Sequence, residues 1–475
     1  MDKKPALELP NELTWLNAEP QQLSAHHGRV VVLLFWNASS VYSHNALLEL
    51  YQLQRKFPES VSAIAIHVPK FTAELDDKII LEVCNRFDVH VIVANDKACL
   101  AWQAYQIESW PTFVLIDSHG MLVDRVLGDM HYKELVAKIN TLTSVIPENL
   151  SLKPRALKSN PKNKSFSVLN HPCGILLHKG LLYVTDTGNN RILECTTEGR
   201  IKRVFGNGLA LNIDGPALES AFCRPVGLCL AREYLYVADS GNHAIRRVRL
   251  IDGYVDTLLG NGAPGRACDQ VVSDYHHIQF NNPTSVNVCQ DVLVVADSGN
   301  NCLWMYNLVS RTFSLLVGSG ELGLVDGVGS KAEMAHPLAI TGSKNCLYIA
   351  EGSSSSIRTV SVPDGLVKTL VGQGLFHYGS NDGDYQSASL QYPCSLVLDD
   401  KRQILWIADS YNRKIRTYDL KNNILTNCAM PSNFLNPCAI ATDDDSIWIV
   451  DSITDTIYRY YLATDYLTRI TIQDS

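Results

Sequence analysis

About two thirds of the chain consists of one unit repeated six times, and this repeat restricts the fold more than any other feature. Each unit starts with a proline and an apolar run, and a second apolar run ends at an acidic residue. The prolines are Pro172, Pro225, Pro283, Pro337, Pro393 and Pro437, and the matching acids are Asp186, Asp239, Asp297, Glu351, Asp409 and Asp451. Proline and acid are 14 positions apart in five units and 16 in the fifth, so the six units share one register.

Each unit has the pattern of four short strands. Apolar runs supply the first, second and fourth, and a strand with a central Ile or Leu follows a Ser/Gly/Asn turn that suits left-handed backbone angles. Because four strands recur six times without an intervening helical period, the sequence predicts a six-bladed β-propeller whose blades bury their faces on one another. The strand from Leu467 is expected to complete the sixth blade, and residues 165–168 are an alternative outer closing strand.

The six repeated acids allow two interpretations. Each can cap the following turn through its own side chain, in an Asx-type hydrogen bond. Alternatively, the six form a ring of carboxylates that faces a central channel and holds a cation. A ligand site needs only a few positions, so recurrence in every unit favours the structural role, and we predict no metal site.

Three of the 13 cysteines directly follow a repeat proline, namely Cys173, Cys394 and Cys438. The other repeats have Val226, Thr284 and Leu338 at this position, so we expect these cysteines to behave as small buried hydrophobic residues. The cysteine total is odd and no Cys-x-x-Cys pair occurs, which favours a reducing compartment over a disulfide framework. We therefore expect a cytoplasmic protein.

The first third of the chain alternates strand and helix patterns, which predicts an α/β domain. Strands are expected at residues 30–36, 61–67, 113–117 and 122–127, and helices at 45–57, 76–86, 97–105 and 132–142. A segment with three prolines and several lysines and asparagines follows, and it has the composition of a connector. The predicted organisation is an α/β domain at 1–146, a linker at 147–164 and the propeller at 165–475.

Two features of the first domain resemble thioredoxin. A strand ends in Phe35-Trp36 before a short loop and a helix, and Trp110-Pro111-Thr112 leads into the strand FVLID like the family's cis-proline loop. In that family a Cys-x-x-Cys pair lies at the helix N-terminus, where the positive helix end favours a reactive thiolate. Here the two positions fall on Ser40 and Ser43, so we expect a redox-inactive site. The resemblance implies a groove lined by Trp36, Trp110 and Pro111 that can dock an extended peptide.

Other candidates in this domain have simpler explanations. A hydrolase would need a base aimed at Ser40 or Ser43, but neighbours in sequence such as Ser43 and His44 rarely point at each other. His44 is expected to be a surface residue at the helix start. Cys84 and Cys99 have apolar neighbours, which favours core packing over a role as surrogate redox thiols.

The repeats and the order of the two domains resemble one known family. The sequence YVADSGN, the preceding Pro-x-Gly and the linkers that end in Asp-Gly at Asp214, Asp326 and Asp382 are similar to NHL repeats. With HVPKF at residues 67–71 and the segment at 93–117, the chain is similar to the NHL-repeat-containing thioredoxin-like family, except that Ser-x-x-Ser replaces the usual cysteines. Animal members carry a further β-rich C-terminal extension, whose functions the resemblance does not bring to a sequence that stops at Ser475.

These observations favour a non-catalytic scaffold that binds a protein or peptide and needs no cofactor. The start of the chain does not have the pattern of a secretory signal, and the longest apolar run, 30–36, is too short to span a membrane. The formal net charge of -8 argues against a general nucleic-acid binder.

Two alternatives stay open at this point. The first is an enzyme, related to thiol-disulfide oxidoreductases or with a site in the propeller channel, although only His26-His27 and His276-His277 are paired and no metal-ligand spacing repeats. The second is RNA binding through the cluster Arg246, Arg247 and Arg249, for which a solvated strand face is the simpler explanation.

Overall fold

The computed structural model describes residues 4–144, 167–265, 278–431 and 433–473, and it divides into two compact units, 1–164 and 165–475. The predicted linker at 147–164 and the pair His276-His277 lie outside the described residues. No helix in the described ranges is long and apolar enough to cross a membrane.

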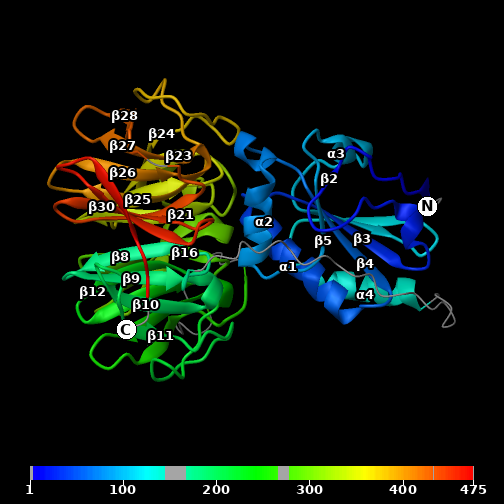
Figure 1. Ribbon diagram of the computed structural model, residues 1–475, viewed down its shortest axis with the longest axis horizontal. Helices are drawn as coiled ribbons and strands as arrows, with labels where there is room; N and C mark the ends of the chain where they lie inside the picture. Colours follow the sequence, from blue (N-terminus) through cyan, green and yellow to red (C-terminus); the bar gives the residue numbers. More distant parts are fainter. Residues whose placement is uncertain (1–3, 145–166, 266–277, 432, 474–475) are drawn as a thin grey trace. The chain divides into compact units, whose positions relative to one another are not determined.

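The first unit contains a seven-stranded sheet with the order β1-β7-β6-β3-β4-β5-β2 (Figure 1). Strands β3, β4 and β5 are parallel, β6 pairs antiparallel with β3, and β7 pairs antiparallel with β6. The strands are β1 Lys4–Pro5, β2 Thr14–Trp15, β3 Val30–Trp36, β4 Val61–His67, β5 Ile92–Asn95, β6 Thr112–Ile116 and β7 Met121–Leu127. The helices are η1 Leu23–His26, α1 Val41–Lys56, η2 Thr72–Leu75, α2 Asp77–Arg86, α3 Leu100–Ala104 and α4 Tyr132–Thr143.

The central strands explain why this unit forms an α/β layer structure. Every residue of β3 and β4 is buried, as expected for parallel strands covered on both faces. Helices α1 and α4 contact each other and β3, while α3 packs with Leu9, Leu13 and Phe35 in another cluster. The predicted thioredoxin-like fold is confirmed.

The second unit is a six-bladed propeller, as predicted from the repeats. Each blade is an antiparallel sheet of consecutive strands, with the first strand innermost around the axis (Figure 1). The first three blades are β8 Gly174–His178, β9 Leu181–Asp186, β10 Arg191–Thr196 and β11 Ile201–Phe205; β12 Pro225–Ala231, β13 Tyr234–Asp239, β14 Ala244–Arg249 and β15 Val255–Leu259; and β16 Pro283–Cys289, β17 Val292–Asp297, β18 Cys302–Asn307 and β19 Phe313–Val317. The last three are β21 Pro337–Ser343, β22 Cys346–Glu351, β23 Ser356–Ser361 and β24 Leu366–Val371, extended by β20 Gly327–Val328; β25 Pro393–Asp399, β26 Ile404–Asp409, β27 Lys414–Asp419 and β28 Ile424–Asn427; and β29 Pro437–Thr442, β30 Ser446–Asp451, β31 Thr456–Tyr461 and β32 Tyr466–Ile470.

Two details of the repeat follow from its sequence. The strand predicted from Leu467 is β32, which pairs with β31 and completes the sixth blade. The turn between the second and third strands of every blade ends in a left-handed residue with φ between +48° and +56°, namely Asn190, His243, Asn301, Ser355, Arg413 and Asp455. These turns place the repeated acid and the third strand side by side.

Candidate functional site

The loop between β3 and α1 and the first turn of α1 carry Ser40 and Ser43, the two residues that the sequence predicts at the positions of a redox pair. Ser40 is the N-cap of α1, and its Oγ accepts a hydrogen bond from the backbone N–H of Ser43 at 3.4 Å. Ser43 is fully buried, and its Oγ accepts from the backbone N–H of Asn37 at 3.1 Å. Both hydroxyl groups therefore hold the start of the helix, a common use of serine at this position.

Asn37 connects this loop to the segment after β4. Its Nδ2 donates to the Val68 carbonyl at 2.9 Å and to Oε2 of Glu74 at 2.8 Å. The same Glu74 oxygen accepts from the backbone N–H groups of Lys70 at 2.7 Å and Phe71 at 3.0 Å. Sequence reasoning missed both residues, because the bonds join positions more than 30 apart.

We expect Asn37→Ala to lower the free energy of unfolding by about 2–3 kcal/mol, since it removes two donor bonds from a buried carbonyl and a buried carboxylate. Ser39→Ala is the matched control. It removes only the hydrogen bond from the Ser39 hydroxyl to Asn37 Oδ1, and this oxygen still accepts from the Ser39 N–H at 3.0 Å. Ser39→Ala should therefore lower the free energy of unfolding by about 1 kcal/mol or less. Urea unfolding of both variants measures the difference, and equal losses would contradict this account of the loop.

The Pro111 loop lies at the same edge of the sheet as the serine loop. Thr112 pairs with Phe35, so Pro111 comes next to the end of β3, from which the serine loop departs. The Trp110-Pro111 peptide bond is cis, and the Trp110 ring lies 4.9 Å from the Trp102 ring. Within the described residues, neither the backbone N–H nor the carbonyl of Trp110 takes part in a hydrogen bond. The fold thus brings Ser40, Ser43, Trp110 and Pro111 to one edge.

Trp36 does not fit the predicted groove and requires a correction. It is fully buried at the end of the central strand, with its ring edge-on to His67 at 5.2 Å. His67 is equally buried, bonds through Nδ1 to Asn95 Oδ1 at 3.0 Å, and has its pKa lowered by burial. Because β3 is covered on both faces, its last side chain belongs to the core, and Trp36 cannot line an open groove.

The expectation that His44 lies at the surface is also wrong. The side chain is buried, its Nε2 is 2.7 Å from the Ala38 carbonyl, and its ring lies 4.9 Å from that of Phe87. The position faces the interior because α1 starts at Val41, four residues before the predicted helix. This geometry directs the imidazole to a backbone carbonyl rather than to a serine hydroxyl.

The two thiols of this unit lie in environments that disfavour a thiolate. Cys84 is fully buried, and burial raises its pKa to about 12. Burial also raises the pKa of Cys99, with a further contribution from Asp96. A cysteine that acts as the attacking nucleophile of a redox site needs the opposite shift in its pKa. Both residues therefore fit core packing, as the sequence suggested.

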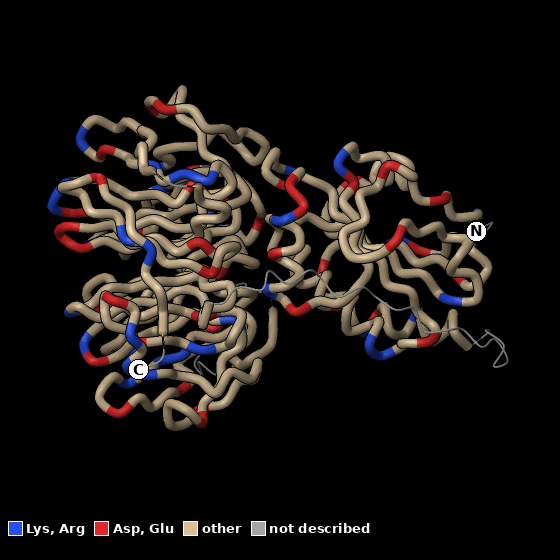
Figure 2. The backbone as a smooth tube through the Cα atoms, in the orientation of Figure 1, with Lys and Arg blue, Asp and Glu red and all other residues tan. Residues whose placement is uncertain are grey.

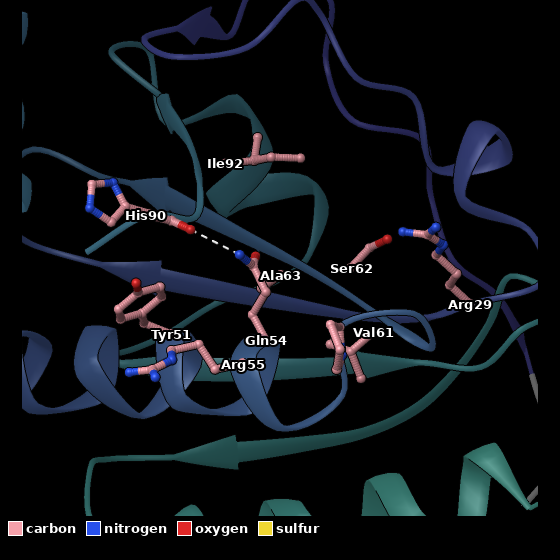
Figure 3. Close-up of a pocket in the computed structure, with 10 residues that line it drawn as sticks. Arg29, Tyr51, Gln54, Arg55, Val61, Ser62, Ala63, His90 and Ile92 are labelled. Atoms are coloured by element: carbon pink, nitrogen blue, oxygen red, sulfur yellow. Dashed lines mark hydrogen bonds between the residues drawn. The ribbon is translucent and has the colours of Figure 1, made fainter. Parts of the chain in front are cut away.

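A cavity of about 380 Å³ opens at the opposite end of the sheet, where β3 begins (Figure 3). Gln54 donates to the His90 carbonyl at 2.9 Å, and the Arg55 guanidinium lies over the Tyr51 ring at 5.9 Å. Arg29 lies at the other end of this cavity from Arg55 and His90 in Figure 3, so these basic groups do not converge. None of the sequence-predicted site residues lines it.

Each repeated acid of the propeller is the last residue of the second strand in its blade, and its side chain is buried. In four blades Oδ1 of the acid accepts from the backbone N–H two residues before the repeat proline, and Oδ2 accepts from the side chain of an Asn three residues after the acid. In the fourth blade Ser354 and Ser356 donate to the longer Glu351 instead. The predicted Asx-type cap is recorded at Asp451, which accepts from the N–H groups of Ile453 and Thr454 at 3.2 Å each. The acid therefore joins the strand that starts its blade to the turn that follows.

Three blades add a buried arginine that connects the repeated acid to an Asp-Gly loop. Arg246, Arg358 and Arg416 each have no exposed side-chain surface. One nitrogen pairs with the blade acid at 3.0 to 3.1 Å, in the pairs Arg246–Asp239, Arg358–Glu351 and Arg416–Asp409. Another nitrogen pairs with the loop aspartate at 2.6 to 2.9 Å, in the pairs Arg246–Asp214, Arg358–Asp326 and Arg416–Asp382. We call these three arrangements the arginine clamps.

Sequence reasoning missed the clamps although a signal was present. The residue after the central Ile or Leu of the third strand is Arg in these three blades and Leu193, Trp304 or Tyr458 in the others. An Asp-Gly pair occurs in the linker before each of the three arginine blades and before none of the others. Backbone turn preference explains an Asp-Gly pair, but this co-occurrence indicates a side-chain partner.

The basic cluster considered for RNA binding is neutralised within its own blade. Arg246 belongs to a clamp, Arg247 pairs with Asp256 at 2.5 Å, and Arg249 pairs with Asp252 at 2.6 Å. Figure 2 shows basic and acidic residues interspersed along the propeller strands and loops. The three arginines therefore do not form one basic surface, and the solvated-face explanation is also wrong for Arg246.

The central channel has a volume of about 310 Å³ and is lined by the first strands of all six blades. Its lining consists of apolar residues with Cys, Ser, Thr, Asn and Gly, and no charged side chain or histidine contributes. The repeated acids do not line it, because they lie on the second strands. The alternative of a carboxylate ring that faces the channel is therefore wrong. Cys173, Cys394 and Cys438 do line it, and only Cys438 is buried, which corrects the expectation of three buried residues.

Comparisons with known proteins agree with the two units. No protein-family model matches the sequence. The NHL repeat-containing protein 2 of Gallus gallus is 30% identical over 459 residues, which cover 89% of this chain and 63% of that protein. Protein SUPPRESSOR OF QUENCHING 1, chloroplastic, of Arabidopsis thaliana is 29% identical over 441 residues, covering 87% of this chain and 41% of that protein. The thiol-disulfide oxidoreductase YkuV of Bacillus subtilis (strain 168) is 23% identical over 138 residues, covering 29% of this chain and 93% of that protein.

The chain thus spans less than two thirds of the length of the larger relatives that it matches. The match to the Gallus gallus protein extends over both structural units, whereas the bacterial match covers less than a third of the chain. With a thioredoxin-like fold followed by six NHL-type blades, the chain is similar over most of its length to the NHL repeat-containing protein 2 of Gallus gallus.

Proposed function

We propose that this protein is a non-catalytic binding protein whose thioredoxin-like unit holds an extended peptide beside the serine loop. The observation that carries the proposal is the backbone of Trp110, which makes no hydrogen bond among the described residues and adjoins the edge where Ser40 lies. An extended peptide can pair with such open backbone groups. The Trp110 ring, half-buried against Trp102, supplies an apolar surface next to them.

The residues at this edge of the sheet favour peptide binding over thiol–disulfide exchange. The bacterial relative named a thiol-disulfide oxidoreductase matches this unit. In the present chain both positions of the redox pair hold hydroxyl groups that are engaged in hydrogen bonds of the loop. A peptide that docks here would meet no nucleophilic thiolate, since a serine hydroxyl does not ionise near neutral pH. We also propose a reducing, cytoplasmic location, supported by the 12 described cysteines, which all stand as thiols.

Fluorescence anisotropy with labelled, reduced and carboxymethylated insulin B chain as an extended-peptide probe tests this proposal. We expect saturable binding to the full chain and a dissociation constant raised roughly tenfold or more by Trp110→Ala, as for a tryptophan at the centre of an interface. Trp15→Ala is the matched control, because Trp15 is a half-buried tryptophan of the same unit on the edge strand β2. Absence of binding, or equal weakening by both substitutions, would refute the proposal.

A further inference from the structure

Three cysteines meet at the channel because the repeat places them at one position in consecutive blades. Cys394, Cys438 and Cys173 directly follow the prolines of the fifth, sixth and first blades, and all three line the channel. The Cys438 thiol is hydrogen-bonded with the Cys173 thiol, and its Sγ also donates to the Pro172 carbonyl at 3.2 Å. Two thiols from different blades are therefore in direct contact.

The contact between Cys173 and Cys438 crosses the junction between the first and last blades of the propeller. Five junctions between neighbouring blades are bridged by the chain, which leads from one blade into the next. The junction between the first and last blades has no such connection, since each of these blades consists of its own consecutive strands. Here β29 and β30 lie against β8 (Figure 1), and single hydrogen bonds cross, such as His171 N–H to Asp455 Oδ1 at 2.7 Å and Ile201 N–H to the Gln473 carbonyl at 3.1 Å. We call this junction the ring seam.

We propose that Cys173 and Cys438 form a reversible disulfide bond across the ring seam when the protein meets a low-molecular-weight disulfide. The proposal is independent of peptide binding by the first unit. A bond between these residues closes a loop that contains five of the six blades, and cross-links that close long loops are the ones expected to stabilise most by restricting the unfolded chain. Oxidation would join the first and last blades covalently at the one junction where the chain does not lead from one blade into the next.

The exchange proceeds in two steps with two electrons transferred. Cys173 is the more exposed of the two thiols, while the contact with Cys173 and burial raise the pKa of Cys438 well above its usual value. The Cys173 thiolate attacks one sulfur of the small disulfide, which breaks its S–S bond and releases one small thiolate. Cys438 then gives its proton to solvent and attacks the Cys173 sulfur, forming the protein disulfide and releasing the second small thiolate. Two protein thiols are oxidised, and one small disulfide is reduced to two thiols.

The test is incubation of the native full chain with oxidised glutathione, then alkylation of remaining thiols, digestion and mass spectrometry of cross-linked peptides. We expect a Cys173–Cys438 cross-link that dithiothreitol removes, together with an unfolding temperature raised by several degrees in the oxidised protein. Faster cross-linking at higher pH is expected as well, because the thiolate is the nucleophile.

Variants separate this pair from the other thiols. Cys438→Ser should abolish both the cross-link and the temperature shift, and Cys438→Ala replaces it if the serine variant does not fold. Cys195→Ser is the matched control, since Cys195 is a buried thiol of the first blade that does not line the channel, and the cross-link should persist there. A Cys394–Cys438 cross-link in the wild-type protein, glutathione adducts without a cross-link, or no reaction would each overturn the proposal without reference to any variant.

Discussion

Arg246→Met is expected to lower the free energy of unfolding by about 3–5 kcal/mol at pH 8, because it leaves the buried carboxylate of Asp239 without its cationic partner. Both side chains of this pair have no exposed surface. Arg246 also donates to the Ala221 and Ile213 carbonyls at 2.9 Å each, and methionine cannot replace these bonds. The side chain of methionine can still pack on the Phe222 ring, which lies 5.2 Å from the guanidinium carbon.

The loss in Arg246→Met should shrink as the pH falls from 8 to 5. Burial raises the pKa of Asp239 from 3.8 to about 6, with Arg246 acting in the opposite direction. Since the pKa is higher in the folded protein, the folded state binds more protons in this window and stability falls as the pH rises through it. Without Arg246 the pKa of Asp239 moves further up, so the variant takes up a proton more readily and regains stability under mild acid.

The neighbouring Arg247→Met is the matched control for the clamp. Arg247 pairs with Asp256, but 30% and 34% of the two side chains remain exposed. An exposed pair of this kind contributes about 0–1 kcal/mol. Urea unfolding of the full chain, combined with hydrogen exchange of strands β13 and β14, reports on both variants. Equal effects of the two substitutions, or a loss in Arg246→Met that does not depend on pH, would contradict the clamp.

The double variant Ser40→Cys/Ser43→Cys is expected to gain a redox-active disulfide that the wild-type site cannot form. The thiol introduced at position 40 would sit at the N-cap of α1, a helix of 16 residues, where the helix end stabilises a thiolate. Cysteines in such places have pKa values of about 3.5–7.5 against an ordinary value of about 8.5. Loss of the serine cap should cost about 1 kcal/mol of stability.

The pH dependence of iodoacetamide labelling at position 40 measures the thiolate directly in this double variant. The single variant Ser40→Cys is the control, because its new thiol lies at the same N-terminus of α1 but has no second thiol with which to form a disulfide bond. A folded double variant that forms no disulfide and labels with an ordinary pKa would show that this edge does not have the geometry of a thioredoxin site.

The six blades and most elements of the first unit were predictable because their signals are local or repeated. The proline-to-acid register reproduces the first and second strands of every blade, and the predicted strand at 61–67 matches β4. The strand β5, Ile92–Asn95, was missed, since it has only four residues and carries no alternation that distinguishes it. Blade four deviates from the repeat without losing the bond pattern, because the serines donate to a longer acid.

The candidate site and the clamps were less predictable because they depend on contacts between distant segments. Strand alternation suggests that one face of β14 meets solvent, so Arg246 was assigned to a surface. In a propeller both faces of a blade pack against neighbouring segments, and this places Arg246 in the interior. Asn37 and Glu74 illustrate the same point, since their bond spans 37 residues and neither belongs to a recognisable motif.

Insulin reduction by the full wild-type chain, with dithiothreitol as electron donor, tests most directly whether the first unit lacks thiol exchange. The rate with the wild-type protein should equal the rate without protein, and Ser40→Cys/Ser43→Cys should exceed it. The Cys438→Ser variant separates any contribution of the ring seam from that of the first unit. Acceleration by the wild-type chain that persists in Cys438→Ser would contradict a thioredoxin-like unit that binds without exchanging thiols.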